Sequence, residues 1–147
     1  MRAVIQRVKE SSVFVDNTCV GHIERGLLVL LGFARDDTEE GIDWLIDKIV
    51  NLRIFEKEDG KFDESLLDID GGLLLVSQFT LYGDCAKGRR PSFSDAMPSP
   101  EARKMFEAFV DRARSRVANV QTGVFQAHMD VALVNDGPVT IIIDSRK

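Results

Sequence analysis

Two short apolar runs constrain this chain more than any other feature of its sequence. Residues 26–33 and residues 73–81 begin at or directly after glycine and are rich in leucine and valine. Runs of this length without alternation are typical of strands that are buried on both faces of a sheet. No window approaches the ~18 consecutive apolar residues that a membrane-spanning helix needs. We therefore expect a sheet with apolar layers on both sides.

Periodicity and turn chemistry predict the remaining elements. The acidic residues at 36–40 predict a helix start with a capping side chain, and an apolar stripe follows at helical spacing. Ser99 and Pro100 predict the cap and the first position of a second helix. The pattern predicts a β-rich α+β fold in one domain, residues 1–147, with two helices outside six or seven strands. The expected strands include residues 1–15, 19–23, 26–33, 73–81, 124–134 and 139–143, and residues 83–98 form a long loop.

Charge is distributed unevenly along the 147 residues. The net charge is −5, which argues against a protein that coats nucleic acid. Residues 34–71 hold 5 basic and 13 acidic side chains, whereas residues 86–118 hold 8 basic and 4 acidic ones. The second stretch fits a local polyanion site and equally a solvated helix face.

Cysteine content and the first residues indicate the class of protein. Cys19 and Cys85 are too few for a disulfide framework or a four-ligand zinc site. The first seven residues contain no apolar core of a signal peptide. These features predict a soluble, cytoplasmic protein, and we expect neither a metal nor a cofactor.

The sequence contains no catalytic constellation with a recognisable spacing. The two histidines, His22 and His128, belong to no metal-spaced cluster, and a lone histidine is more often structural than a ligand. Cys85 is either a thiol nucleophile or an ordinary loop cysteine. A Ser-His-Asp triad stays open, because its members need not be close in sequence.

Two segments depart from the apolar pattern around them. Residues 77–80, Ser-Gln-Phe-Thr, end the second apolar run with hydroxyl and amide groups. They form either a ligand site at a sheet edge or an ordinary strand terminus. Residues 135–138, Asn-Asp-Gly-Pro, separate two apolar strands, and proline cannot join a central ladder. This second segment is either a simple turn or a rigid wedge of backbone carbonyl groups.

In combination, five blocks of the sequence resemble the D-aminoacyl-tRNA deacylase family. The blocks are residues 1–8 (MRAVIQRV), 26–32 (GLLVLLG), 77–81 (SQFTL), 88–93 (GRRPSF) and 133–140 (LVNDGPVT). They follow one another in register from the first residue nearly to the last. The resemblance implies a mostly antiparallel, barrel-like sheet with two outer helices. It also implies a homodimer that acts on aminoacyl-tRNA.

The resemblance further implies hydrolysis of the ester that joins a D-amino acid, or glycine, to the terminal ribose of tRNA. Gly137 and Pro138 would form a cis dipeptide that one protomer inserts into its partner's active site, with Arg7 holding its orientation. Two rigid carbonyl groups near the substrate α-carbon would bind its ammonium and exclude an L side chain. Backbone N–H groups around Gln78 and Phe79 would stabilise the oxyanion.

The same resemblance suggests roles for further residues. Ser77 and Thr80 complete the catalytic block, and Thr80 is either a nucleophile or a residue that shapes the pocket. The sequence supplies no obvious neighbouring base, which favours the second role. Water would then attack the ester, assisted by the 2′-hydroxyl of the terminal adenosine. The candidates for contacts with tRNA phosphate or ribose are Lys87, Arg89 and Arg90.

Two alternative functions stay open. A non-catalytic nucleic-acid-binding dimer on the same fold would carry a larger basic surface, or more stacking aromatics than Phe79, Tyr82 and Phe93 near the candidate site. A thiol hydrolase would use Cys85, which alkylation of that cysteine would test.

Overall fold

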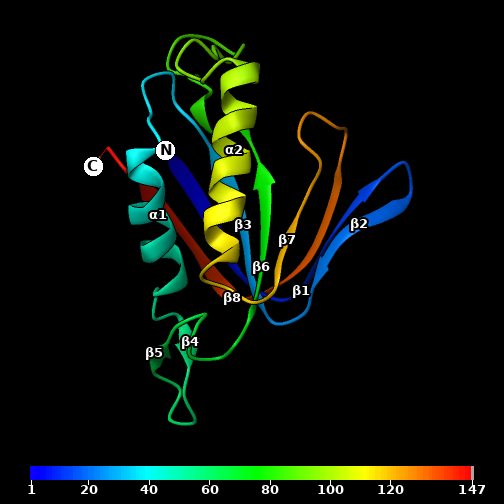
Figure 1. Cartoon of the computed structure of the whole chain (residues 1–147), viewed down its shortest axis with the longest axis vertical. Helices are drawn as coiled ribbons and strands as arrows, with labels where there is room; N and C mark the ends of the chain where they lie inside the picture. Colours follow the sequence, from blue (N-terminus) through cyan, green and yellow to red (C-terminus); the bar gives the residue numbers. More distant parts are fainter. Residues whose placement is uncertain (147) are drawn as a thin grey trace.

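The computed structural model describes residues 1–146, and its long first strand organises the sheet (Figure 1). β1 (Arg2–Val15) pairs along one side with β2 (Thr18–Ile23) and β3 (Gly26–Gly32), and along its other side with β8 (Asp130–Asp144). All three pairings are antiparallel. Asp16 and Asn17 adopt positive φ between β1 and β2, which suits a tight hairpin turn.

Two parallel strands extend the sheet beyond β3. β6 (Gly72–Ser77) pairs with β3, and β7 (Val120–Thr122) pairs with β6. The sheet curls until β2 reaches β7, so that a Cβ atom on Gly21 would lie 2.7 Å from the carbonyl oxygen of Thr122. The predicted α+β fold with a barrel-like, mostly antiparallel sheet is confirmed.

Two helices cover one face of this sheet (Figure 1). They are α1 (Glu40–Val50) and α2 (Ser99–Arg114). A 3-10 helix, η1 (Phe79–Tyr82), follows β6, and a small hairpin of β4 (Phe55–Glu56) and β5 (Phe62–Glu64) follows α1. Among the described residues, no helix is both long and apolar enough to cross a membrane.

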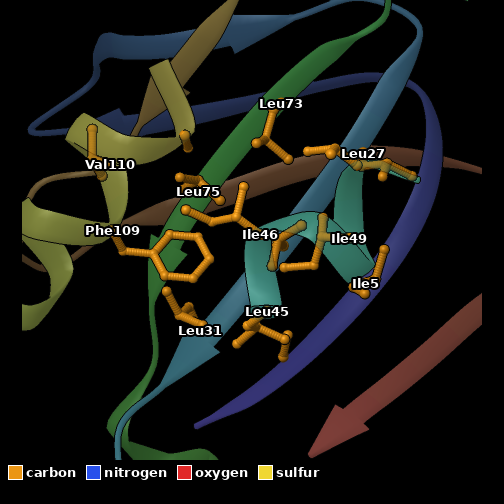
Figure 2. Packing of buried hydrophobic residues seen from close by; sticks show 14 of the residues in the cluster. Ile5, Leu27, Leu31, Leu45, Ile46, Ile49, Leu73, Leu75, Phe109 and Val110 are labelled. Atoms are coloured by element: carbon orange, nitrogen blue, oxygen red, sulfur yellow. The ribbon is translucent and has the colours of Figure 1, made fainter. Parts of the chain in front are cut away.

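The first apolar run is buried on two faces, as the sequence predicts, and the second is buried as far as Val76, whereas Phe79 is exposed. On the other face of the sheet, Leu28 and Leu74 pack in a second cluster with residues of β1, β2 and β8. Each fully buried leucine or isoleucine contributes roughly 1.5–3 kcal/mol. The side chains that meet on the helix face include those of Leu27, Leu31, Leu73, Leu75, Leu45, Ile46, Ile49 and Phe109 (Figure 2).

The helix starts differ from the prediction. In the described part of the chain, neither helix has a hydrogen-bonded side-chain cap. The carboxylate of Asp37 instead accepts a hydrogen bond from the N–H of Ala34 (2.6 Å) and pairs with the α-ammonium group of Met1 (2.6 Å). Ser99 lies inside α2, and Pro98 occupies the cap position. The Asp37 carboxylate, which local sequence would assign to capping, is thus bonded to a neighbouring backbone N–H and to the distant ammonium group of Met1.

The end of the chain forms one long strand rather than two. β8 continues through residues 135–138 because β1 pairs with it on both sides of the interruption. Gln6 pairs with Thr140 and Val8 pairs with Asn135, so four residues of β8 stand opposite one residue of β1 and bulge out of the ladder. The strand predicted at 124–134 begins only at Asp130, and β7 forms where the sequence pattern predicts no strand.

Candidate active site

A cavity of about 620 Å³ opens beside the ends of β3 and β6. Its walls are mainly apolar, and within the described residues its lining contains no Asp, Glu, Lys or Arg. A cavity of this size and composition suits a small, partly aromatic ligand. The lining residues are Leu31, Phe33, Val76, Ser77, Gln78, Phe79, Met97, Ser99, Ala102, Phe125, Gln126, Ala127, His128, Met129 and Val131.

The Ser-Gln-Phe-Thr segment contributes one wall, but it does not continue the strand. β6 ends at Ser77, and the residues predicted to extend it form η1. The N–H of Gln78 still donates to the carbonyl oxygen of Leu31 over 2.8 Å, which completes the pairing with β3. The N–H of Leu81 then donates back to the Gln78 oxygen over 3.3 Å and begins the helix. The chain therefore turns as soon as its partner strand ends.

The start of η1 presents backbone donors beside the cavity. The first N–H groups of a helix have no partner inside it, and in η1 these belong to Phe79 and Thr80. The N–H of Gln78, which we expected among the oxyanion donors, is already bonded to β3. Of the two expected N–H donors, that of Phe79 is therefore still available to a ligand. The N–H of Thr80 is available next to it.

Thr80 and Gln78 form a side-chain pair at this point. The hydroxyl of Thr80 accepts a hydrogen bond from the amide of Gln78. An amide cannot take up the hydroxyl proton at neutral pH, so this contact does not activate Thr80 as a nucleophile. Among the described residues, the cavity lining includes Gln78 but not Thr80.

A second wall comes from residues 125–129, which lie within the strand predicted at 124–134. Gln126 has a φ of 66°, and its side-chain oxygen accepts a hydrogen bond from Arg103 of α2 (3.2 Å). The Arg103 guanidinium also lies 4.8 Å from the centre of the Phe125 ring. His128, set aside as a lone histidine, lies at the rim with its side chain 96% exposed. The sequence signal for this loop is weak: polar residues interrupt the apolar pattern at 125–129.

A separate constellation surrounds Arg7, which is 5% exposed. Its Nε donates to the carbonyl oxygen of Asp136 (2.8 Å), and its Nη1 donates to that of Ile54 (2.6 Å). The carboxylates of Glu56 and Asp136 lie 3.5 and 3.4 Å from the guanidinium. A guanidinium keeps both its charge and its rigid set of donors. Arg7 therefore ties down the elbow, our name for the bulge of residues 136–139.

Asn135 closes the elbow at its base. Its Nδ2 donates to the carbonyl oxygens of Arg7 (3.1 Å) and Val139 (3.0 Å). The Gly137–Pro138 peptide bond is cis, and both residues are exposed. A Cβ atom on Gly137 would overlap the side chain of Asn135. Glycine is thus the residue that fits here without rearrangement.

The elbow and the cavity lie apart within one copy of the chain. Arg7 pairs with Leu27 near the start of β3, whereas Ser77 pairs with Leu31 near its end. Four residues along a strand span about 13 Å, and β1 and β3 also lie between β8 and β6. In the described chain, neither residue 137 nor residue 138 lines the cavity. The two sets of predicted site residues are therefore not brought together in a single copy.

The loop between η1 and α2 is anchored at both ends. Asp84 and Ser92 pair across it through two hydrogen bonds of 2.8 and 2.9 Å. At its far end, the N–H of Met97 donates to the carbonyl oxygen of Phe33 over 3.0 Å, and both residues line the cavity. The predicted cationic residues thus lie on an exposed segment near the cavity. The exposed side chains of this segment include Cys85, Lys87, Arg89 and Arg90.

Neither Tyr82 nor Cys85 supplies the missing base. Burial, together with the nearby carboxylates of Asp37 and Asp144, raises the pKa of Tyr82 to about 12, so its phenol stays protonated at neutral pH. Cys85 is exposed and, in the part of the chain described, does not line the cavity. Among residues 1–146, no group of three or more His, Cys, Asp or Glu side chains is arranged to hold a metal ion.

Known proteins match the chain over nearly its whole length. A family model described as D-Tyr-tRNA(Tyr) deacylase matches residues 4–144. A D-aminoacyl-tRNA deacylase of Thermosipho africanus is 59% identical over 147 residues, covering 100% of this chain and 99% of the relative. The chain belongs to the D-Tyr-tRNA(Tyr) deacylase family. A D-aminoacyl-tRNA deacylase of Kosmotoga olearia is 60% identical with the same coverage.

Solved structures match this member of the deacylase family as well. One, described as c-Myc DNA Unwinding Element Binding Protein, has a TM-score of 0.93 and 40% identity, covering 98% of each chain. Another, described as a probable eukaryotic D-amino acid tRNA deacylase, has a TM-score of 0.85 and 20% identity, covering 97% of each chain. The second likeness shows the fold alone. Membership of the deacylase family confirms the expected enzyme class, a hydrolase.

Proposed function

We propose that this deacylase-family member hydrolyses the ester between a D-amino acid, or glycine, and the 3′-terminal adenosine of tRNA. One observation carries the proposal: Phe79 lines an apolar cavity, and the N–H groups of Phe79 and of the next residue, Thr80, are unpaired within η1. The names of the relatives support D-aminoacyl-tRNA as the substrate. In the cytoplasm, this reaction removes D-amino acids from tRNA before translation.

The cavity suits a terminal nucleoside. Phe33, Phe125 and Met129 offer apolar surface to a base, and the amide of Gln126 can bond to its polar edge. With the base in this position, the ester lies near the start of η1. The N–H groups of Phe79 and Thr80 then donate to the carbonyl oxygen that becomes negative, an effect of about 3 kcal/mol per donor.

The chemical step uses water and the substrate's own hydroxyl group. Water attacks the ester carbonyl carbon, and the bond between that carbon and the 3′-oxygen breaks. The described cavity lining contains no Asp, Glu, Lys or Arg, and its one histidine, His128, lies at the rim with its side chain 96% exposed. The 2′-hydroxyl of the adenosine therefore relays the water proton to the departing 3′-oxygen. The products are a free amino acid and tRNA. Thr80 shapes the pocket through Gln78, which lines the cavity and whose amide donates to the Thr80 hydroxyl.

The elbow supplies the chirality filter in this proposal. Its backbone is tied down by Arg7 and Asn135, and it projects from the sheet. The carbonyl oxygens of Gly137 and Pro138 receive the substrate α-ammonium and leave no room for an L side chain, whereas a D side chain points away. Since the elbow is remote from the cavity of its own copy, it comes from the partner in a homodimer.

Deacylation of D-tyrosyl-tRNA and L-tyrosyl-tRNA tests this function. We expect rapid release of D-tyrosine and no detectable release of L-tyrosine above the rate in buffer. Equal rates for the two esters would contradict the filter. Absence of hydrolysis of both would contradict the deacylase assignment.

Substitution Thr80→Ala tests whether Thr80 is the nucleophile or a residue that shapes the pocket. Because Thr80 has an amide rather than a base as its partner, we expect near-normal turnover of D-tyrosyl-tRNA. Circular dichroism checks that the variant is folded. Complete loss of activity in a folded variant would favour the nucleophile role instead.

A non-catalytic nucleic-acid binder is the second candidate. One matching solved structure is described as a DNA unwinding element binding protein, and that description concerns that protein. A protein that only binds nucleic acid does not need unpaired N–H groups beside an apolar cavity, because such groups stabilise an oxyanion during ester hydrolysis. Tight binding of DNA without hydrolysis of either tyrosyl ester would favour this alternative.

A further inference from the structure

Two phenylalanine rings, Phe79 and Phe93, are exposed together at the mouth of the cavity. Their side chains are 56% and 38% exposed. The ring centres lie 5.1 Å apart, and the rings meet edge to face at 67°. Phe79 belongs to the cavity lining, and Phe93 belongs to the loop between η1 and α2. Clustered exposed apolar side chains of this kind mark a contact site.

The backbone around Phe93 holds its ring in place. The pair of Asp84 and Ser92 lies directly before it, and the N–H of Ala96 donates to the carbonyl oxygen of Phe93 over 3.1 Å. A Cβ atom on Gly83 would lie 3.0 Å from Cε1 of Phe93, so the ring rests on the glycine backbone. A ring that is already positioned needs little ordering when a ligand binds.

The charge of the surrounding loop indicates the kind of ligand. Residues 83–98 contain three cationic side chains, Lys87, Arg89 and Arg90, between two acidic ones, Asp84 and Asp95. Arg35 adds a fourth cation, since its Nε donates to the carbonyl oxygen of Ser94 over 3.1 Å. Exposed aromatic rings beside cations are typical of sites for single-stranded nucleic acid, where bases stack and phosphates pair with the cations.

We infer that Phe79 and Phe93 form a stacking platform for the unpaired base that precedes the terminal adenosine of tRNA. The inference rests on the proposed function, which assigns the cavity to that adenosine. The preceding nucleotide then leaves the cavity past Phe79 and meets the platform, while the cations of the loop hold its phosphates. Phe93 is a positioning residue for the RNA and takes no part in ester chemistry.

Two substrates separate this role from catalysis. D-tyrosyl-tRNA carries the preceding nucleotides, whereas D-tyrosyl-adenosine carries the same ester without them. We expect Phe93→Ala to raise the KM for D-tyrosyl-tRNA about ten-fold, the effect of losing one stacked base, with kcat unchanged. The kinetics with D-tyrosyl-adenosine stay at wild-type values. Phe93→Tyr keeps the ring and the wild-type KM.

Binding of uncharged tRNA tests the platform without hydrolysis. Phe93→Ala is expected to raise the Kd about ten-fold, as loss of one stacked base predicts. Trp44→Ala is the matched control, because Trp44 is a 43% exposed aromatic residue on α1, and it leaves the Kd unchanged.

Three results would overturn the inference. They are an equal change in KM for both esters, unchanged tRNA binding by Phe93→Ala, and an altered oligomeric mass of that variant, which would assign the rings to a protein interface. Ring-dependent tRNA binding without hydrolysis of either ester by the wild-type chain would overturn the proposed function and still support the platform.

Discussion

Asn135 occupies the space that a side chain at position 137 would need. Its amide nitrogen bridges the carbonyl oxygens of Arg7 and Val139, at 3.1 and 3.0 Å. Arg7 in turn binds the carbonyl oxygen of Asp136. Two of these three contacts, Arg7 to Asp136 and Asn135 to Arg7, join residues 128 or more positions apart and have no local signature. The bond from Asn135 to Val139 is local.

Gly137→Ala should impair the filter more than the fold. The added methyl group displaces the Asn135 side chain and disturbs its two hydrogen bonds, at a cost of about 1–3 kcal/mol. We expect the ratio of kcat/KM for D- over L-tyrosyl-tRNA to fall about ten-fold or more, which corresponds to about 1.4 kcal/mol of discrimination. Val134→Ala, at an exposed position of β8 beside the elbow, serves as the control. An unchanged ratio would show that the shape of the elbow does not set selectivity.

Asp144 provides a pH-dependent contribution to stability at the end of β8. Burial alone would raise its pKa, but hydrogen bonds from the Arg146 N–H and the Arg2 guanidinium, and the charge of Arg2, lower the pKa below its ordinary 3.8. The folded protein thus binds fewer protons than the unfolded chain near that pH. The contribution is complete above about pH 4 and is lost as the pH falls through the lowered pKa.

Asp144→Asn should lower the free energy of unfolding by about 1–3 kcal/mol at pH 7, the worth of charge-assisted hydrogen bonds. Urea titrations between pH 7 and pH 2.5 measure the difference from the wild type, which should shrink below about pH 4. The control is Asp111→Asn, because Asp111 is 79% exposed and lies 3.9 Å from Arg114. A difference that does not vary with pH would show that the carboxylate charge is not responsible.

At the scale of elements, the functional features arise where a strand loses its regular pairing. β6 gives way to η1 after Gln78 makes its bond to β3. This change leaves the N–H groups of Phe79, which lines the cavity, and of Thr80 without a partner inside η1. β8 bulges opposite Arg7 because four of its residues face one residue of β1. In both places the neighbouring strand, rather than the local sequence, decides where the irregularity falls.

The loop between η1 and α2 should dominate the salt dependence of tRNA binding. Each phosphate contact contributes about 0.7–0.9 to the slope of log K against log salt concentration. Neutralising Lys87, Arg89 and Arg90 to Gln should therefore flatten the slope by roughly 2, measured by filter binding. The control neutralises three exposed lysines on other elements, Lys9, Lys48 and Lys61. Equal flattening in both variants would contradict a specific role for the loop.

At the scale of the whole molecule, the separation of elbow and cavity has a functional consequence. One copy contains both features, but they stand at different ends of β3 and on different strands of the sheet. Under the proposed function, one active site then needs two copies of the chain. Loss of association should therefore remove selectivity even when each chain is folded.

Mixed dimers test this arrangement. Gly137→Ala chains have a damaged elbow and an intact cavity, and Ala127→Trp chains have an intact elbow and a filled cavity. With Ala127→Trp in excess, we expect release of L-tyrosine by Gly137→Ala to fall while release of D-tyrosine persists. An elbow that acts in its own copy predicts no change in L-tyrosine release on mixing.

The sequence by itself determined the two buried strands, the apolar stripes of both helices and the positions of the polar blocks. These features depend on local periodicity and on residue types that one segment carries alone. The resemblance of those blocks to a family also pointed to Ser77–Phe79 and to Arg7. In the structure Ser77–Phe79 line a cavity and Arg7 donates to the carbonyl oxygen of Asp136, and their roles in the reaction stay predictions.

Only the tertiary structure decided that residues 79–82 turn into a helix, that β8 is continuous, and that residues 125–129 close the cavity. It also decided that the N–H of Gln78 donates to the carbonyl oxygen of Leu31, and that the elbow lies away from the cavity of its own copy. Each of these outcomes follows from pairing between segments that are remote in the sequence. Such pairing selects which backbone groups are bonded and which stay available to a ligand.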